Sequence, residues 1–329
     1  MPRTLRAQHD RFALIRPFRI ARGVKTVADV ISVTLVEDGV AGRGEGVPYP
    51  RYGESVETSL AAIEQVRGAI QDGAGRQALQ SLLPASAARN AVDCALWDLE
   101  ARRAGVDVAS LAGVPAGRAL VSALTLGIDT PAAMSEVARR NAGAPLLKVK
   151  VDAEDPAARI RAVRAAAPDS ALIVDPNESW DRKLVEEMQP VLVEAGVALI
   201  EQPVPAGEDE WLEGFVPAVP ICADEAVHVV ADLDRIASRY QAINVKLDKT
   251  GGLTGALELA RAARERGLGL MTGCMICSSL SIAPAFQVAL LSDFVDLDGP
   301  LWLLEDRAGG VRDEGGMLKP PVPGFWGNT

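Results

Sequence analysis

Histidine is scarce in this chain, since its 329 residues include only His9 and His228. Chemistry that depends on several histidines is therefore excluded. Cysteine is scarce too, and a few scattered thiols do not form a disulfide framework. This usage indicates a reducing compartment, so we expect a cytoplasmic protein. The four cysteines are Cys94, Cys222, Cys274 and Cys277.

Positive charge is also in deficit, because 34 Lys and Arg face 44 Asp and Glu, a formal net charge of −10. An acidic chain suits neither a nucleic-acid backbone nor an anionic lipid surface, so we expect neither partner. Long apolar runs are missing as well, and the first ten residues carry no apolar segment of the signal-peptide type. The most apolar stretch, 268–291, is broken by Gly273, Ser278 and Pro284, which predicts a strand, a turn and a helix rather than a membrane span.

The first part of the chain predicts a small α+β domain over residues 1–118. Residues 27–45 alternate in polarity and contain Asp38-Gly39, which is typical of a β-hairpin. Apolar residues at helical spacing then predict helices over 54–69 and 87–104. The length allows a second, larger domain after this one.

After residue 118 short apolar runs recur, with Ala-, Arg- and Glu-rich helical segments between them. This spacing fits strand-plus-helix units, and a run of eight such strands closes a barrel. A doubly wound open sheet is the competing fold, but no G-x-G-x-x-G follows a first strand. We expect the barrel over 119–304 and a Gly- and Pro-rich segment, 305–329, that returns over the first domain. The eight predicted strands are 121–126, 146–151, 171–175, 197–201, 220–225, 242–247, 268–273 and 294–298.

Charged residues end six of the eight predicted strands, and their signs are grouped. A single charged strand end is ordinary, because such ends are wet. The grouping is informative, because chemistry in a barrel gathers at the carboxyl ends of the strands. In strand order these residues are Lys148 and Lys150, then Asp175, Glu201, Asp224, Lys246, and finally Asp296 with Asp298.

Three successive strands bear the carboxylates of Asp175, Glu201 and Asp224. Hard oxygen ligands of this kind suit Mg²⁺, whereas zinc would call for histidine or clustered cysteine. Three carboxylates also need a cation if they are to share a small volume, because like charges raise one another's pKa. We therefore predict a Mg²⁺ site.

The lysines lie on both sides of this acidic group. Lys148 and Lys150 are two apart on a strand, so both point the same way, and Lys246 lies four strands further on. Burial beside Mg²⁺ and another ammonium would bring a lysine pKa from about 10.4 toward ~7–8. Two such bases can remove a proton from one face of a carbon and return one to the other, while Mg²⁺ stabilises the enediolate. The pattern predicts racemisation or epimerisation next to a carboxylate.

The chain resembles the enolase superfamily, in its muconate-lactonising subgroup with the K-x-K motif, and within it the dipeptide epimerases of the L-Ala-D/L-Glu type. The resemblance covers nearly the whole chain. It implies a modified TIM barrel, (β/α)7β, with an N-terminal α+β capping domain that acts as a lid. The matching segments include I-A-R-G (20–23), P-Y-P-R-Y-G-E-S (48–55), L-L-K-V-K (146–150), E-Q-P (201–203), P-I-C-A-D-E (220–225), N-V-K-L-D-K-T-G-G-L (244–253) and D-L-D-G-P (296–300).

The resemblance also implies roles for single residues. Mg²⁺ would be held by the three carboxylates, and Lys150 and Lys246 would be the two acid/base catalysts. The expected substrate is a dipeptide inverted at its C-terminal residue, with murein peptide recycling as the pathway and a homo-oligomer left open. The substrate-binding residues would be Lys148 for the carboxylate, Asp296 and Asp298 for the ammonium group, Arg22 for the glutamate side chain, and Thr125.

Other functions could use some of these residues. An o-succinylbenzoate synthase or cycloisomerase of the same subgroup uses the same metal and lysines, but its substrate has no ammonium group and does not need the Asp296-Leu-Asp298 pair. A non-catalytic metal-binding barrel has no use for two flanking lysines.

Cys277 stands where many relatives carry glutamate, and Cys274-x-x-Cys277 resembles a redox pair without the usual context. His228 is interpreted as a surface or helix-start residue, and the N-terminal residue of the dipeptide is left open.

Overall fold

The alternating segment near the N-terminus forms the hairpin that the sequence predicts. In the computed structural model, which describes residues 3–327, β2 (Gly23–Glu37) pairs antiparallel with β3 (Val40–Gly46). The turn between them places Asp38 and Gly39 at φ of 51° and 83°, the left-handed values of a tight hairpin turn.

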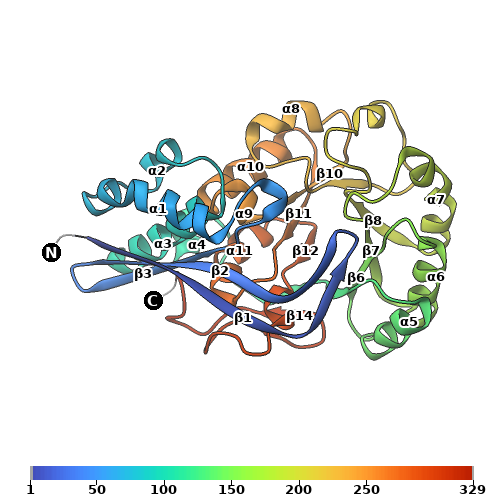
Figure 1. Ribbon diagram of the computed structural model, residues 1–329, viewed down its shortest axis with the longest axis horizontal. Helices are drawn as coiled ribbons and strands as arrows, with labels where there is room; N and C mark the ends of the chain where they lie inside the picture. Colours follow the sequence, from blue (N-terminus) through green and yellow to red (C-terminus); the bar gives the residue numbers. More distant parts are fainter. Residues whose placement is uncertain (1–2, 328–329) are drawn as a thin grey trace.

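A long first strand was not predicted. β1 (Thr4–Ile20) pairs antiparallel with β2, from Thr4 opposite Val36 to Ile20 opposite Gly23, and completes a sheet of order β1-β2-β3. Most of its side chains are at least partly exposed, so its sequence lacks the apolar alternation of a half-buried strand. The β1–β2 hairpin extends from the capping domain across the barrel (Figure 1).

Helices cover one face of this sheet. The predicted helix at 54–69 begins two residues later, because the Ser55 side chain caps it by accepting a hydrogen bond from the Thr58 amide. α3 packs closely on β3, where a Cβ added to Gly44 would lie 2.1 Å from the Ala91 carbonyl oxygen. Only glycine permits this approach. The helices are α1 (Val56–Gln71), α2 (Arg76–Leu82), α3 (Ala87–Ala104) and α4 (Val108–Ala112).

The eight predicted barrel strands are all present and parallel, but the first predicted segment splits into β4 (Leu120–Val121), which lies outside the barrel sheet, and the barrel strand β5 (Leu124–Leu126). The Ala123 amide donates to the Val295 carbonyl at 2.8 Å, which brings the last strand to the first. This confirms the α/β barrel with an antiparallel capping domain. The strands after β5 are β6 (Leu146–Lys150), β7 (Ala171–Asp175), β8 (Val197–Glu201), β9 (Ile221–Ala223), β10 (Ala242–Val245), β11 (Gly269–Gly273) and β12 (Phe294–Asp296).

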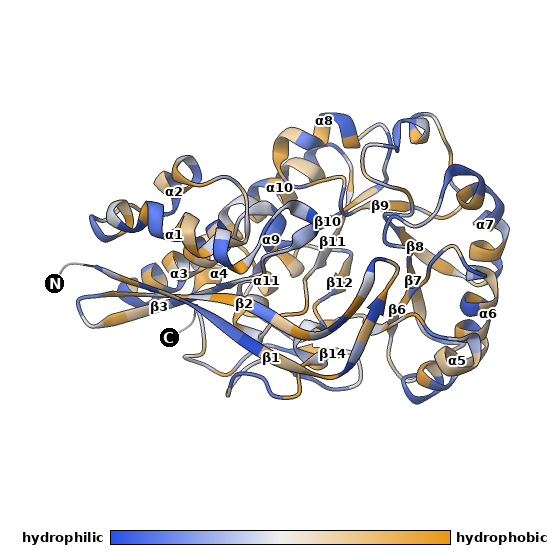
Figure 2. Cartoon of the chain, viewed as in Figure 1, coloured by the Kyte–Doolittle hydropathy of each residue, from blue (hydrophilic) through white to orange (hydrophobic). Residues whose placement is uncertain are grey.

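Amphipathic helices surround the strands, and those on the outside carry both hydrophilic and hydrophobic residues (Figure 2). The connection from β8 to β9 holds only the short η2 (Glu210–Leu212), because prolines and glycines over 203–220 interrupt any longer helix. The barrel helices are α5 (Pro131–Arg140), α6 (Pro156–Ala166), α7 (Arg182–Glu194), α8 (Leu233–Ile236), α9 (Leu247–Thr250), α10 (Leu253–Glu265) and α11 (Ser279–Ala289).

The apolar stretch 268–291 is strand β11 followed by helix α11, as predicted. In the part of the chain described here, no helix has the length and apolar character to cross a membrane.

The C-terminal segment lies against the capping domain. Arg307 forms ion pairs with Asp10 and with the fully buried Glu45, and the Trp326 indole donates to the Arg43 carbonyl at 2.8 Å. β13 (Arg312–Asp313) and β14 (Met317–Lys319) form a small sheet with β4. The divisions at residues 118 and 304 stay predictions, and residues 1–2 and 328–329 of those ranges lie outside the described chain.

Candidate active site

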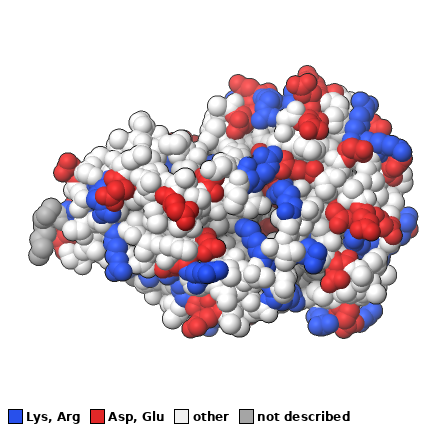
Figure 3. Space-filling model, viewed as in Figure 1, with Lys and Arg blue, Asp and Glu red and all other residues white. Residues whose placement is uncertain are grey.

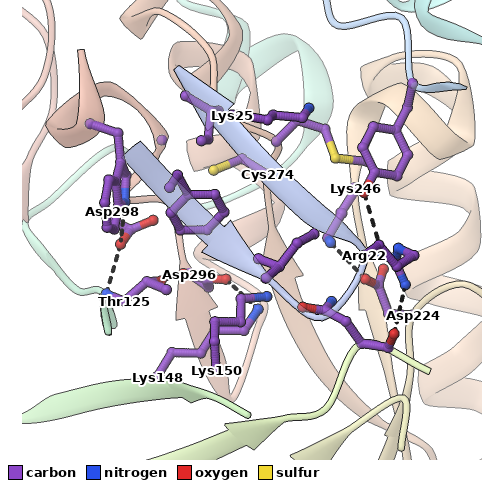
Figure 4. Close-up of a pocket in the computed structure, with 18 of the residues that line it drawn as sticks. Arg22, Lys25, Thr125, Lys148, Lys150, Asp224, Lys246, Cys274, Asp296 and Asp298 are labelled. Carbon is purple, nitrogen blue, oxygen red and sulfur yellow. Dashed lines mark hydrogen bonds and ion pairs between the residues drawn. The ribbon is translucent and has the colours of Figure 1, made fainter. Parts of the chain in front are cut away.

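A recess opens where the barrel strands end beneath the β1–β2 hairpin. Lys and Arg atoms gather near the centre of this face of the molecule (Figure 3). Barrel and capping domain both line the recess. Figure 4 shows Lys148 and Lys150 together, with Lys246 beside Asp224 and with Asp298 and Thr125 on the side away from Arg22.

The two lysines of β6 share Asp175 at the end of the neighbouring strand. Lys150 Nζ donates to Asp175 Oδ2, and Lys148 Nζ lies 3.1 Å from the same oxygen. Burial by itself raises the pKa of Asp175, but these two ammonium groups outweigh it and lower the pKa to about 2. Asp175 is therefore ionised at neutral pH.

Glu201 lies at the centre of the charged group. Its Oε1 accepts a hydrogen bond from Asn244 at 2.8 Å, and its Oε2 lies 2.6 Å from Lys148 Nζ but outside a hydrogen-bonding direction. Burial and the charges of Asp175 and Asp224 raise the pKa of Glu201 above its ordinary value. An additional positive charge close to this carboxylate would stabilise its ionised form.

Asp224, directly after β9, is held by two other lysines. Lys246 Nζ lies 2.7 Å from Asp224 Oδ2, and Lys249 Nζ lies 2.6 Å from Asp224 Oδ1. Burial raises the pKa of Asp224, but both ammonium groups outweigh it, and the pKa lies well below its usual range. Lys249 is fully buried and also donates to the Asn244 carbonyl, so it fixes the end of strand β10.

Lys150 and Lys246 stand on opposite sides of the recess. They come from β6 and from the residue after β10, which are four strands apart in a barrel of eight. Both line the recess, and both are less than one-tenth exposed. A carbon held between them would have one lysine on each face.

The acidic pair at the end of β12 lies near β5. Asp296 Oδ2 lies 2.7 Å from Lys148 Nζ, and Asp298 Oδ2 accepts hydrogen bonds from the Thr125 amide at 2.8 Å and from the Trp302 indole at 3.3 Å. Burial and the charge of Asp296 raise the pKa of Asp298 to about 6. Two carboxylates at this end favour a cationic group.

Arg22 lies at the tip of the β1–β2 hairpin and reaches the barrel. Its guanidinium forms ion pairs with Glu225 at 2.5 Å and with Glu178 at 3.0 Å, and donates to the Asn177 carbonyl. Asn177 and Glu178 have φ of 48° and 67°, an unusual backbone that turns the loop after β7 toward the hairpin. The structure thus brings Arg22 to the recess, where Glu178 and Glu225 already compensate its charge.

Every predicted site residue lies at or beside the recess, but Lys25, Tyr49 and Glu225 line it as well and were not predicted as site residues. Tyr49 and Glu225 lie in the matching segments 48–55 and 220–225, which gave them no role, whereas Lys25 of β2 had no sequence signal. Burial raises the pKa of Glu225 to about 7. Only the folded hairpin brings Lys25 to the recess.

His228 and the cysteines lie at the edge of this region. The His228 ring packs edge-on against Tyr52 at 4.5 Å, and burial lowers its pKa to about 4, so it is neutral at pH 7. Cys274 lines the recess, whereas Cys277 is buried. Burial raises the pKa of the Cys277 thiol, which disfavours the reactive thiolate.

The carboxylate set can be tested for its fit to a divalent cation. Within residues 3–327, no three His, Cys, Asp or Glu side chains are arranged as a ready metal site, because lysine ammonium groups lie among the carboxylates. The donors themselves are all hard oxygens from three adjacent strands, and Glu201 Oε2 is buried without a hydrogen bond from a described residue. This chemistry fits Mg²⁺.

Two family models cover most of the chain. Residues 3–113 match the N-terminal domain of the mandelate racemase / muconate lactonizing enzyme family, and residues 132–325 match the enolase C-terminal domain-like model. The L-Ala-D/L-Glu epimerase of Escherichia coli K12 is 46% identical over 306 residues, which cover 92% of this chain and 95% of that one. The N-acetyl-D-glutamate racemase of a Pseudoalteromonas species is 43% identical over 305 residues, 91% and 96% of the two chains.

Solved structures of enolase-family proteins match the chain as well. An enolase family member from Agrobacterium tumefaciens with homology to dipeptide epimerases, bound to sodium and L-Ala-L-Glu, matches with a TM-score of 0.96 and 48% identity over 99% of this chain and 100% of that one. A dipeptide epimerase from Methylococcus capsulatus, complexed with Mg and L-Arg-D-Lys, matches with a TM-score of 0.91 and 33% identity over 99% of both chains. These matches confirm the resemblance that the sequence motifs indicate. The chain belongs to the enolase superfamily, with the domains of its mandelate racemase and muconate lactonizing enzyme branch, and is an isomerase related to the epimerases and racemases of that branch.

Proposed function

We propose that the protein is a Mg²⁺-dependent dipeptide epimerase that inverts the α-carbon of the C-terminal residue, with L-Ala-D/L-Glu as the substrate. The placement of Lys150 and Lys246 on opposite sides of one recess carries this proposal. One lysine removes the α-proton from one face, and the other delivers a proton to the opposite face. The roles exchange in the reverse direction.

The carboxylates Asp175, Glu201 and Asp224 would hold the metal. When bound, Mg²⁺ supplies the positive charge that stabilises the enediolate form of the substrate. Lys148, which is almost fully buried beside these carboxylates, would contact the substrate carboxylate. The α-proton is then removed within a recess that the hairpin shields from bulk water.

The lysine that acts as a base must lose its proton near neutral pH. Burial lowers the pKa of Lys246, but the carboxylates of Asp224 and Glu201 outweigh burial and raise the pKa above its usual value. A divalent cation on the same carboxylates would offset this upward effect, since it neutralises their charge. Metal binding and base strength are therefore coupled in this proposal.

The ends of the recess suit the two ends of a dipeptide. The Asp296 and Asp298 carboxylates, with Thr125 beside them, would receive the ammonium group. Arg22, which lies on the other side, would receive the glutamate side chain. The Agrobacterium protein described above is bound to L-Ala-L-Glu, which supports a dipeptide with a C-terminal glutamate as the ligand.

A second candidate is racemisation of an N-acylated amino acid, because the Pseudoalteromonas relative is an N-acetyl-D-glutamate racemase. Such a substrate has no ammonium group, so the buried Asp298 would keep only its neutral hydrogen-bond partners, and Asp296 would have Lys148 alone as a cation. Dipeptide epimerisation therefore accounts for more of the site. An o-succinylbenzoate synthase or cycloisomerase leaves the same pair unexplained.

The setting is a further part of the proposal. Four free cysteines support a cytoplasmic location, and the activity named for the Escherichia coli relative supports a role in recycling murein peptides. We keep the divisions at residues 118 and 304 as proposed domain boundaries.

The proposal is tested by incubating the protein with Mg²⁺ and L-Ala-L-Glu in D₂O and following the glutamate α-proton by NMR. Loss of that signal together with growth of the L-Ala-D-Glu signal is the expected result. N-acetyl-L-glutamate and the succinylbenzoate precursor are run in parallel. Exchange of N-acetyl-L-glutamate alone would establish the second candidate, and turnover of the precursor alone would overturn both.

A further inference from the structure

Gln202 is a fully buried residue of the barrel mouth to which the proposed reaction gives no role. It directly follows Glu201 at the end of β8. The neighbouring strands of the barrel sheet are β7, which ends in Asp175, and β9, which Asp224 follows (Figure 2). The three proposed metal ligands therefore lie at three adjacent strand ends, and their spacing depends on how firmly these ends are held together.

The backbone of Gln202 is bonded to both neighbouring strand ends. Its amide donates to the Cys222 carbonyl of β9 at 2.8 Å, and its carbonyl accepts from the Glu178 amide in the loop after β7 at 2.9 Å. Gln202 has φ of 32°, a value that costs free energy in a residue other than glycine. The contacts around Gln202 must therefore hold it in this conformation.

The side chain of Gln202 uses all of its hydrogen-bonding capacity. Its Oε1 accepts from the amides of Asp224 at 2.9 Å and Ala226 at 3.0 Å, so it fixes the backbone of a proposed metal ligand. Its Nε2 donates to the Val204 carbonyl at 2.9 Å and to the Tyr240 hydroxyl at 3.1 Å. An apolar side chain of the same size could fill this space but could make none of the four contacts.

Tyr240 determines which way the Gln202 amide points. The Tyr240 hydroxyl donates to Asp209 at 2.7 Å, and the fully buried Asp209 forms an ion pair with Arg239 at 2.8 Å. Because the hydroxyl proton is directed to Asp209, the hydroxyl oxygen accepts from Gln202 Nε2. The amide oxygen is then left to face the Asp224 amide, where an acceptor is required.

Gln202 thus contacts the segments that follow all three ligand-bearing strands. We propose that Gln202 is a positioning residue of the metal site, which sets the spacing of Asp175, Glu201 and Asp224 and thereby the affinity for Mg²⁺. Residues that orient metal ligands without touching the metal commonly control its affinity. The inference rests on the Mg²⁺ site of the proposed function.

The experiment measures the Kd of Mg²⁺ by isothermal titration calorimetry, with chelator-treated protein and no substrate. Gln202→Met keeps the size of the side chain and removes its four hydrogen bonds, whereas Tyr240→Phe keeps Gln202 and removes one of its partners. The matched control is Gln189→Met in helix α7. Gln189 also bonds two backbone groups, the Ala218 amide and the Val185 carbonyl, but contacts none of the proposed metal ligands.

We expect Gln202→Met to raise the Kd of Mg²⁺ by about 10- to 100-fold, because the three strand ends lose their common partner. Tyr240→Phe should raise the Kd by about 3- to 10-fold, the effect of one hydrogen bond that orients the amide. Gln189→Met should keep the native Kd. Melting temperatures without metal are measured for all three variants, so that a general loss of stability is distinguished from a loss of metal affinity.

Other outcomes separate this inference from the proposed function. A native Kd in Gln202→Met would overturn the role of Gln202 alone. An equal rise of the Kd in Gln189→Met would also overturn it, since the rise would then follow from lost stability. If Gln202→Met does not fold, Tyr240→Phe decides, and a native Kd in that variant overturns the inference. A native protein that binds no Mg²⁺ would overturn the proposed metal site and this inference together.

Discussion

Two regions of this molecule bury carboxylates, and they surround them with different partners. At the barrel mouth, Asp175 and Asp224 each contact two lysine ammonium groups, which lower the pKa of both carboxyls. At the seam between the capping domain and the barrel, Asp93 of α3 and Asp248 of α9 accept hydrogen bonds from neutral groups only. These partners include the Thr254 amide at 2.9 Å and the Asn90 amide group at 2.7 Å.

The pKa values follow this difference. Burial raises the pKa of Asp93 to about 6 and that of Asp248 to about 7, because neither carboxyl forms an ion pair with a described residue and the charges of Arg76 and Arg89 offset burial at Asp93 only in part. Burial also raises the pKa of Asp175 and Asp224 at the mouth, but there the lysine ammonium groups outweigh it and lower the pKa. Buried acids at the seam therefore act as hydrogen-bond acceptors that hold two domains together, whereas Asp175 and Asp224 at the mouth are kept ionised by lysines. Glu201 is intermediate, since burial and the charges of Asp175 and Asp224 raise its pKa, an effect that the proposed metal would offset.

The largest expected effect is at the mouth, on the two proposed bases. Lys150→Ala and Lys246→Ala should each lower the rate of epimerisation by at least about 10³-fold, because one of the two proton transfers is lost. NMR integration of the two L-Ala-Glu diastereomers measures this rate. Asp248→Asn at the seam, with folding verified by circular dichroism, is the matched control and should keep most activity. Equal losses in all three variants would remove the distinction between the regions.

The second-largest expected effect is the response to metal, which should differ between variants of the mouth and variants of the seam. Saturating Mg²⁺ at about 100 times its Kd should stabilise the native protein by about 2.7 kcal/mol, which calorimetry detects as a rise in melting temperature. Glu201→Gln should lose this rise, because it removes one of the three carboxylates. Asp248→Asn should retain the rise in full. A rise that survives Glu201→Gln would place the metal elsewhere.

The seam should make stability depend on pH in a defined direction. The pKa of Asp248 is about 7 in the folded protein and lies near 3.9 in an unfolded chain, so between these values the folded state binds more protons. Stability therefore falls as pH rises through this window. Asp248→Asn keeps the acceptor oxygen and should remove a loss of about 3 kcal/mol between pH 4 and 7. Urea unfolding across this range measures the slope, and an unchanged slope in the variant would contradict the assignment.

The smallest effect is expected at the exposed rim of the mouth. Arg51 pairs with Glu178 at 2.8 Å, but its side chain is 40% exposed, so water screens the pair. Arg51→Ala should cost less than about 1 kcal/mol in stability. Urea unfolding tests this, with the surface pair variant Arg264→Ala as a comparison. A loss of several kcal/mol would show that the rim is as tightly coupled as the mouth.

Sequence alone predicted the barrel well, because each parallel strand is a short apolar run between amphipathic helices. The strand ends then gave the charged residues from Lys148 to Asp298 in the correct order around the mouth. The sequence did not predict β1, because its exposed side chains leave no periodic signal. It also did not predict that the connection from β8 to β9 lacks a full helix.

The sequence also could not predict which residues interact with the charged side chains. Lys25 meets the recess only because the hairpin folds across the barrel, and the same fold brings Arg22 to Glu225, a pair that the sequence does not indicate. The seam was missed for the same reason, since the donors to Asp93 and Asp248 (Thr254 and Asn90) lie 161 and 158 residues away in the sequence.

Stereospecific exchange tests the two-lysine arrangement most directly. L-Ala-L-Glu and L-Ala-D-Glu are incubated separately in D₂O with Mg²⁺ and with Lys150→Ala or Lys246→Ala, and the glutamate α-proton is followed by NMR. In the proposed mechanism each lysine faces one side of the α-carbon, so each variant should exchange the proton of a single epimer, and the two variants should select opposite epimers. If both variants exchange the same epimer, or interconvert both at the native rate, the lysines do not stand on opposite faces of the reacting carbon.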